Sequence, residues 1–462
     1  MYCFDSAPRG AYLDNLRGFF DGARVFLKLD NYNYVDKKTV VNIIKPKDEF
    51  CKSWQVASSM PSLKIDESGF GSYIVDNYLD LIDHPFVIGD FAEYSFSLNN
   101  RSLNEGIISN SNIKIISNSN KDNISEYKVK HEIIITGHHH GKDIPRLLKD
   151  VEQICETAIN IFGELPIAKK DKYCFFLDVV RAGFGGIEHK NSTALLCSHH
   201  DLPNKVTTNK DANGDNSITT NTNEKYLQLL GLFSHEYFHL WNVKRIMPEA
   251  FVNPNLNKEA YTEQLWIFEG ITSYFEDLIL IKSKVITLND YLLLLTKNIN
   301  SFANNIGTVN QTLKESSFYT WTKFYQQDEN AANSIVSYYR KGALAALCLD
   351  LMIIKDTSGE YSLSDVMRYL WENYGKINRG LKENEFVDVV KKVTNLDYTE
   401  FFNASLNTTE KLPIDSLLSQ FGVSCNFKEV DDLRNFGIRL RNGSTSVAVV
   451  FNDTPAEVGG LA

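Results

Sequence analysis

Two histidines, His235 and His239, stand four residues apart, with Glu236 directly after the first. On a helix, positions i and i+4 share one face, so both imidazoles can bind a single metal ion. Zinc suits this pair, because it lowers the pKa of bound water to about 7 and so permits hydrolysis at neutral pH. Glu236 lies where it can reach such a water rather than the metal. The spacing therefore predicts a zinc-dependent hydrolase.

A third ligand is expected, because a catalytic zinc usually has three protein ligands and one open position. Residues 226–233, ahead of the two histidines, form an apolar run typical of a buried helix. Farther along, Glu269 is the one carboxylate in a second apolar run, where burial without a partner would be costly. We therefore predict Glu269 as the third ligand. Glu276 and Asp277 are the alternatives, and their adjacent positions indicate a solvated helix face.

Both apolar runs carry longer motifs. Residues 235–246 read His-Glu-Tyr-Phe-His-Leu-Trp-Asn-Val-Lys-Arg-Ile, and residues 266–274 read Trp-x-x-Glu-Gly-x-Thr-x-Tyr. Together they resemble the glycyl aminopeptidase family, a branch of the gluzincin metallopeptidases. In that family two histidines and the glutamate of Glu-Gly bind zinc. The resemblance thus implies one zinc ion per chain, held by His235, His239 and Glu269.

A glycine-rich segment ahead of these motifs agrees with the resemblance. The sequence Gly-Gly-Ile-Glu-His that begins at Gly185 resembles the exopeptidase motif of gluzincin aminopeptidases, usually written G-x-M-E-N. Ile187 and His189 depart from that pattern. An aminopeptidase must hold the free ammonium of its substrate, and Glu188 is the carboxylate predicted to do so. Gly185 and Gly186 are expected in a turn where the backbone can approach the substrate closely.

A tyrosine completes the predicted site. Peptide hydrolysis needs a hydrogen-bond donor for the developing oxyanion, and a tyrosine hydroxyl is neutral at pH 7. Residues 338–344, Tyr-Tyr-Arg-Lys-Gly-Ala-Leu, resemble the segment that carries the catalytic tyrosine of these aminopeptidases in Tyr-x-Lys-Gly. Their match to this pattern makes Tyr339 the predicted donor, and Tyr338 is the alternative.

The pattern of apolar residues predicts an α+β multidomain protein. Residues 1–140 alternate short β-rich runs with polar breaks and indicate a β-sheet domain. Its expected strands include residues 23–29, 39–44 and 128–135. An Asn-rich repeat at 107–120 is expected to be a loop.

Residues 141–412 form the predicted thermolysin-like (gluzincin) zinc peptidase domain. Helical spacing of apolar residues begins at 143–162, and a strand is expected at 172–180. Residues 203–224 are polar and should form a long loop. Helices are expected to dominate from residue 226 to about residue 410.

Residues 413–462 differ in character. The runs at 436–440 and 447–450, followed by Thr-Pro-Ala-Glu-Val-Gly-Gly-Leu, resemble the first part of a PDZ domain. PDZ domains bind extended protein C-termini by strand addition, so such partners are implied for a complete domain. The PDZ pattern stops midway, and residues 9–14 resemble the middle of the family's β domain. We therefore interpret the sequence as truncated at both ends.

Composition restricts the partners and the compartment. The net charge of −10 argues against nucleic-acid binding. The seven cysteines are scattered and lack any Cys-x-x-Cys pair, which favours a reducing, cytoplasmic location over a disulfide framework. No apolar run reaches 18 residues, so no membrane span is predicted.

Two further histidine groups are interpreted as solvated loops. His138, His139 and His140 follow a predicted strand, and neighbouring side chains of an extended chain point to opposite faces. His199 and His200 are read in the same way, although a substrate-facing role stays open for them.

The sequence thus predicts a zinc aminopeptidase that acts on peptides with a free N-terminus. A preference for N-terminal glycine or alanine is implied by the resemblance alone. One alternative is a zinc endopeptidase that recruits protein C-termini through its PDZ domain, which activity on amine-blocked peptides would favour. The other is a non-enzymatic peptide-binding scaffold, which would need neither metal ligands nor a base.

Overall fold

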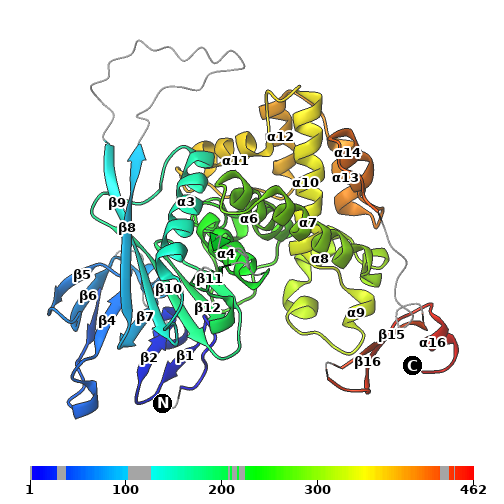
Figure 1. The fold of residues 1–462 in the computed structure, drawn as a ribbon. Coiled ribbons are helices and arrows are strands. Elements are labelled where there is room, and N and C mark those ends of the chain that lie inside the picture. The colour runs from blue at the N-terminus through cyan, green and yellow to red at the C-terminus, as the bar shows by residue number, and fades with distance from the viewer. Residues whose placement is uncertain are drawn as a thin grey trace, which may run out of the picture. The chain divides into compact units, whose positions relative to one another are not determined.

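The computed structural model describes residues 3–28, 38–101, 126–205, 209–210, 216–217, 224–426, 436–441 and 443–461 (Figure 1). The chain forms two compact units: Met1–Leu240 with Ile279–Ile286, and Trp241–Leu278 with Thr287–Ala462. We call them unit 1 and unit 2. The Asn-rich repeat at 107–120 and most of the polar segment at 203–224 lie outside the described residues.

Unit 1 begins with two small antiparallel sheets, with strand orders β1-β2-β7-β4 and β3-β6-β5. Their strands are β1 Ala11–Leu13, β2 Arg17–Phe20, β3 Thr39–Ile43, β4 Gln55–Ser58, β5 Ser62–Ile65, β6 Gly71–Val75 and β7 Phe86–Gly89. Large apolar side chains, among them Trp54, Phe70, Tyr73 and Phe86, form one buried core here. The predicted β-rich N-terminal region is confirmed.

One expected strand is a helical turn instead. Residues Gly22–Val25 form α1, where the sequence predicted a strand over 23–29. Gly22 is buried, and an added Cβ would lie 2.9 Å from the carbonyl oxygens of Leu81 and Ile82. The chain turns at this tightly packed glycine, and a short apolar run does not by itself distinguish a turn from a strand.

The third sheet has five strands in the order β11-β12-β10-β9-β8, and β9, β10 and β12 run parallel. These strands are β8 Ala92–Arg101, β9 Glu126–Gly137, β10 Lys172–Val180, β11 Gly185–Glu188 and β12 Ser192–Ser198. The strands expected at 128–135 and 172–180 are confirmed. Because β8 and β9 precede residue 140, the sheet joins both sides of the domain boundary predicted there.

Both faces of the five-stranded sheet are covered. On one face Phe176 packs with Val87 of the four-stranded sheet. The preceding residue, Phe175, has its ring 5.3 Å from the ring of Phe233 in α4, which spans Glu224–Phe238. Alternate side chains of a strand point to opposite faces, so the sheet lies between a second sheet and a helix.

Helix α3, Ile144–Phe162, packs beside α4 (Figure 1). It begins where the Asp143 side chain accepts a hydrogen bond from the backbone N–H of Arg146, and it ends at Gly163 with a φ of 90°. The helix expected at 143–162 is confirmed.

Most helices lie in unit 2, as predicted for residues 226–410. Helix α10, Tyr338–Asp356, is buried along most of its length and contacts α7, α8, α11 and α14. The helices from α5 onward are α5 Glu249–Val252, α6 Ile271–Lys282, α7 Leu288–Ala303, α8 Leu313–Phe318, α9 Ala331–Ser334, α11 Leu363–Leu370, α12 Glu385–Thr394, α13 Thr399–Asn407 and α14 Ile414–Gln420. Within the described parts of the chain, no helix is both long and apolar enough to cross a membrane.

The last described segment contains β15 Ile438–Leu440, β16 Val447–Val450 and α16 Pro455–Val458. The two strands pair antiparallel. The Asn333 side chain connects this segment to α9 within unit 2, because Asn333 Nδ2 donates to the Val450 carbonyl oxygen at 2.9 Å.

Candidate active site

A buried polar contact holds α4 against the five-stranded sheet. His131 Nε2 lies 2.9 Å from the Tyr237 hydroxyl, and His131 Nδ1 lies 3.1 Å from the Val129 carbonyl oxygen. Nδ1–H therefore donates to the carbonyl, and Nε2 accepts from the tyrosine. Burial lowers the pKa of His131 to about 4, so the ring is neutral. The contact restrains the rotation of α4 and thereby the directions of His235 and Glu236.

The two motif histidines face each other at the end of α4. His239 lies one residue past the helix, but its backbone N–H still donates to the His235 carbonyl oxygen, 3.2 Å away. The ring centroids are 4.6 Å apart. Two imidazoles that share a tetrahedral zinc at ordinary Zn–N distances have centroids about 5 Å apart. The spacing of this pair fits one shared ion.

Glu236 is buried against the exopeptidase segment. A Cβ at Gly186 would lie 2.7 Å from Glu236 Cγ, so only glycine leaves room for the glutamate side chain. The Thr193 hydroxyl donates to the Ile187 carbonyl at 2.9 Å and lies 3.5 Å from Glu236 Oε2. The glycine that the sequence assigned to substrate approach also makes space for the predicted base.

Glu188 ends an edge strand, which corrects the prediction of a glycine-rich turn. Gly185 and Gly186 pair antiparallel with β12, and Gly185 does so with a φ of 151° that favours glycine. The potential ligand atoms of Glu188, Glu236 and His239 all lie within 4.8 Å of one another. The structure thus brings the predicted ammonium-binding carboxylate beside the predicted base.

His189, one of the two departures from the exopeptidase motif, contacts the start of the chain. Its Nε2 lies 3.2 Å from Asp21 Oδ1, and both residues are buried. Its backbone N–H donates to the Ser192 carbonyl. The histidine joins β11 to the four-stranded sheet region and leaves Glu188 as the carboxylate of this motif.

In unit 2, Glu269 lies in a π-helical turn, Trp266–Gly270, a local form that is frequent at functional sites. Asn242, three residues after His239, holds this turn. Its Nδ2 donates to Thr272 Oγ1 and to the carbonyl oxygen two residues before Glu269, each at 3.0 Å. The Asn242 and Thr272 side chains are fully buried. The chain just after the histidines is thereby tied to the turn that carries Glu269.

Helix α10 crosses this turn in backbone contact. A Cβ at Gly270 would lie 2.6 Å from Gly342 Cα and 2.8 Å from the Tyr338 carbonyl oxygen. The glycines of Glu-Gly and Lys-Gly therefore allow the two segments to touch. Tyr339 lies one turn before Gly342, and burial, aided by the charge of Glu269, raises the pKa of Tyr339 well above its ordinary value. Its hydroxyl stays protonated at neutral pH.

The alternative tyrosine already has a structural partner. Tyr338 is 1% exposed, and its hydroxyl accepts a hydrogen bond from Thr320 Oγ1 at 3.0 Å. The rings of Tyr338 and Tyr339 stack with centroids 4.7 Å apart. Tyr339 is half-buried, and the choice between the two tyrosines stays a prediction.

The potential ligand atoms of His235, His239 and Glu269 all lie within 4.8 Å of one another. The alternative ligands, Glu276 and Asp277, belong to neither group of potential metal ligands that the described residues form. Asp277 also differs from its expected position on a solvated face. Burial, and then the charge of Glu276, raises the pKa of Asp277 well above its ordinary value.

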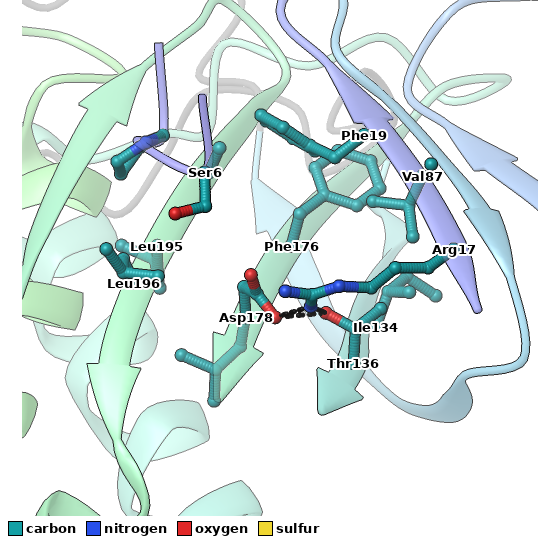
Figure 2. A pocket seen from close by; sticks show the side chains of 14 residues that line it. Ser6, Arg17, Phe19, Val87, Ile134, Thr136, Phe176, Asp178, Leu195 and Leu196 are labelled. Carbon is teal, nitrogen blue, oxygen red and sulfur yellow. Dashed lines mark hydrogen bonds and ion pairs between the residues drawn. The ribbon is translucent and has the colours of Figure 1, made fainter. Parts of the chain in front are cut away.

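An ion pair fastens the four-stranded sheet to the five-stranded sheet (Figure 2). Arg17 reaches Asp178, and the Thr136 hydroxyl donates to the same carboxylate at 2.8 Å. Phe19 and Phe176 lie beside the ion pair and line a cavity of about 20 Å³. Such a volume holds one water molecule, so we regard the cavity as a packing gap and not as a ligand site.

Sequence reasoning missed the residues that support the site. Asn242 and Thr272 stand inside the quoted motifs, so their type and position could have suggested a buried polar link. Nothing in the local sequence distinguished Thr193, because its neighbours in the fold are distant along the chain.

Comparisons with known proteins give two family-model matches. A model of the M61 glycyl aminopeptidase family matches residues 228–345, and a model of the M61 N-terminal domain matches residues 1–90. No curated protein sequence matches the chain.

Solved structures give two further likenesses. An aminopeptidase N family protein from Idiomarina loihiensis is 34% identical with a TM-score of 0.84, and the alignment covers 100% of this chain and 73% of that one. An M1 zinc metallopeptidase from Deinococcus radiodurans is 12% identical with a TM-score of 0.50, covering 89% of this chain and 74% of that one. The second likeness shows the fold alone.

The mixed α/β fold with its β-rich N-terminal region agrees with these matches. The relative from Idiomarina loihiensis is similar along the whole of this chain. The two family models match the N-terminal region of this chain and the segment that contains its motifs from His235 to Tyr339. The family predicted from the motifs is confirmed: the chain belongs to the M61 glycyl aminopeptidase family.

Proposed function

We propose that this peptidase is a zinc aminopeptidase that removes N-terminal residues, glycine or alanine by preference, from peptides. One observation supports the proposal most. The ligand atoms of His235, His239 and Glu269 lie within 4.8 Å of one another, and those of Glu188 and Glu236 lie equally close to His239.

The residues fit a zinc ion. Two imidazoles and one carboxylate are a donor set typical of catalytic zinc, which leaves one position open for water or substrate. His235, His239 and Glu269 would hold it. When bound, zinc would supply a Lewis acid that acidifies water and polarises the peptide carbonyl.

The residues beside the metal position supply proton transfer and charge stabilisation. Glu236 would take a proton from the attacking water and pass it to the leaving amine. Tyr339, which keeps its proton at neutral pH, would donate a hydrogen bond to the oxyanion.

Glu188 would set the aminopeptidase register. Its carboxylate would pair with the substrate ammonium while the first peptide carbonyl lies beside Glu236 and Tyr339. An amine-blocked peptide carries no cation for this partner. The free N-terminus is therefore the feature of the substrate that Glu188 would recognise.

The test compares free and acetylated forms of Gly-X, Ala-X and Leu-X peptides. We expect hydrolysis of the free forms, fastest for glycine and alanine. Glu188→Ala should lower kcat/KM for the free amines by about 10-fold or more, because a charged hydrogen bond contributes about 1.5–3 kcal/mol. Acetylated peptides should show no matching loss. Comparable hydrolysis of acetylated peptides by the wild type would favour the endopeptidase alternative.

We also propose three domains: 1–140, the catalytic residues 141–412, and a partial PDZ domain at 413–462. The pairing of β8 and β9 with β10 supports moving the first boundary toward residue 90. The order β15, β16, α16 supports the PDZ-like reading, and protein C-termini would be the partners of such a domain.

A further inference from the structure

Half of the ten histidines gather at one edge of the five-stranded sheet. His138, His139 and His140 follow the last residue of β9, and His199 and His200 follow the last residue of β12. Strand β10 runs parallel to and between these two strands, so their carboxyl ends share one edge. The fold thus unites two groups that the sequence analysis interpreted as separate solvated loops.

His138 is the centre of the group. Its ring centroid lies 5.0 Å from that of His199 and 5.8 Å from that of His140. These separations are close to the 4.6 Å between His235 and His239, and to the value of about 5 Å for two imidazoles on one ion. These three histidines are not among the groups of described residues whose potential ligand atoms already lie within 4.8 Å of one another, so binding requires changes of rotamer. His138 and His140 are exposed and His199 is partly so, which allows such changes.

The hydrogen bond of His199 prepares it as a ligand. Its Nδ1 lies 2.7 Å from the His138 carbonyl oxygen, so Nδ1–H is the donor. The neutral ring then carries its lone pair on Nε2. Metal-binding histidines are typically oriented in this way, with the second ring nitrogen donating to a carbonyl or carboxylate.

The other two histidines are placed less favourably. The His139 ring stacks on that of His140 at 5.3 Å with planes 20° apart, so these two rings lie face to face, and His139 Nδ1 lies 3.1 Å from the Gly137 carbonyl oxygen. His200 has a ring contact with His199 only, at 5.9 Å. The geometry therefore separates a set of three, His138, His140 and His199, from these two neighbours.

Two charged residues lie on the connections that carry these histidines, Lys142 after His140 and Asp201 after His200. Lys142 Nζ donates to Asn204 Oδ1 at 2.8 Å, and the charge of Lys142 lies near that of Asp201. The Asp201 carboxylate in turn accepts from the Ser198 backbone N–H at 2.7 Å. Lysine and aspartate offset each other and leave the imidazoles as the available donors.

We propose that His138, His140 and His199 bind one divalent transition-metal ion, of the class of Ni²⁺, Cu²⁺ or Zn²⁺, at a site distinct from the candidate active site. Imidazole donors without carboxylates suit these ions and not Ca²⁺ or Mg²⁺, which require oxygen ligands. The bound ion would join the connection after β9 to the connection after β12, and so stabilise this edge of unit 1.

The test titrates Ni²⁺ into the tag-free full chain by calorimetry. His138→Gln/His199→Gln should weaken Ni²⁺ binding at least 10-fold. The matched control, His139→Gln/His200→Gln, removes the same number of imidazoles from the same segments and should change the affinity less than 2-fold. Both variants keep His235 and His239, so any binding there cancels from the comparison.

Thermal unfolding gives a second readout. Saturating Ni²⁺ should raise the melting temperature of the wild type and of the control, because an ion that binds only the folded state stabilises it. The rise should be smaller in His138→Gln/His199→Gln than in the control, because both variants keep His235 and His239 and differ only at the proposed site; the peptide hydrolysis of His138→Gln/His199→Gln should be unchanged. Equal Ni²⁺ affinities for the two double variants would overturn the proposal, and would assign the binding to scattered surface histidines.

Discussion

Two groups of histidines in unit 1 have similar ring separations and opposite surroundings. His235 and His239 come from one helical turn, and His239 is 1% exposed beside Glu188 and Glu236. His138 and His199 are 61 residues apart in the chain and lie near the surface, where their rings contact each other. The first pair is set by local spacing, and the second by the parallel pairing of three strands.

This difference teaches what distinguishes a catalytic metal position from a simple binding position. Hydrolysis needs a carboxylate to take a proton, a donor for the oxyanion and a place for the ammonium. The buried pair has candidates for each role. The exposed group offers ligands alone, so we expect it to bind metal without catalysing hydrolysis.

Removal of the predicted base, Glu236, should have the largest effect on activity, because only the group at His235 and His239 is expected to catalyse hydrolysis. Glu236→Gln keeps the shape of the side chain but cannot take a proton, so kcat/KM on glycyl peptides should fall about 10² to 10⁴-fold. Zinc content, measured by atomic absorption, should stay at the wild-type level. Near-normal turnover at full zinc occupancy would show that Glu236 is not the base.

His131 tests the effect of burial on a histidine of the same unit. Its pKa is about 4 when folded and about 6.5 when unfolded, so between these values the unfolded state binds a proton that the native state does not. Stability should therefore fall by up to about 3 kcal/mol as the pH decreases from 6.5 to 4.

His131→Phe should flatten that acid dependence. At pH 7 it should cost about 1–3 kcal/mol, because the Tyr237 hydroxyl loses its hydrogen bond to His131. His139→Gln, which changes a more exposed histidine, serves as the control and should retain the wild-type slope in urea unfolding measured across this pH range. An equal slope in wild type and His131→Phe would assign the acid sensitivity to other groups.

Lys341 of unit 2 is a buried cationic side chain, in contrast to the exposed histidines around His138 and His199. It is 1% exposed, burial lowers its pKa to about 8, and its Nζ has no hydrogen-bond partner among the described residues. The native state releases this proton near pH 8, whereas the unfolded state keeps it to about pH 10.5. Stability should therefore rise with pH between these values.

Lys341→Met should abolish that rise and stabilise the protein at pH 7 by about 1–3 kcal/mol. Lys355→Met, on the exposed end of the same helix, should leave the stability within about 0.5 kcal/mol. Guanidinium unfolding at pH 7, 8.5 and 10 measures both effects. Destabilisation by Lys341→Met at pH 7 would indicate a favourable role for the ammonium.

The contact between Gly270 and Gly342 should affect one metal position and not the other. A Cβ at Gly342 would lie 2.8 Å from Gly270 Cα, so Gly342→Ala should displace the turn that carries Glu269 at a cost of about 1–3 kcal/mol. We expect lower zinc affinity and lower activity, with Ni²⁺ binding at His138 and His199 unchanged. Wild-type zinc affinity in this variant would mean that the crossing does not position Glu269.

The elements that the sequence predicted well are those with a local signal. The helix at 143–162 carries its own cap, and the strands at 128–135 and 172–180 each contain a short apolar run, at 133–135 and 173–177. The expected strand at 23–29 was wrong, because a buried glycine turns the chain there. The segment that ends at Glu188 is an edge strand and not a turn, because it pairs antiparallel with β12.

What the sequence by itself determined is the set of chemical groups: two histidines at helical spacing, a glutamate between them, and a family whose motifs recur in order. Each of those features is contained within a few consecutive residues, so periodicity and pattern suffice to find it. The tertiary structure alone decided that Asn242 ties the histidine segment to the turn of Glu269, and that Gly342 lets α10 touch it. It also decided that His138 lies beside His199. These contacts join residues far apart in the chain, and only strand pairing and helix packing bring them together.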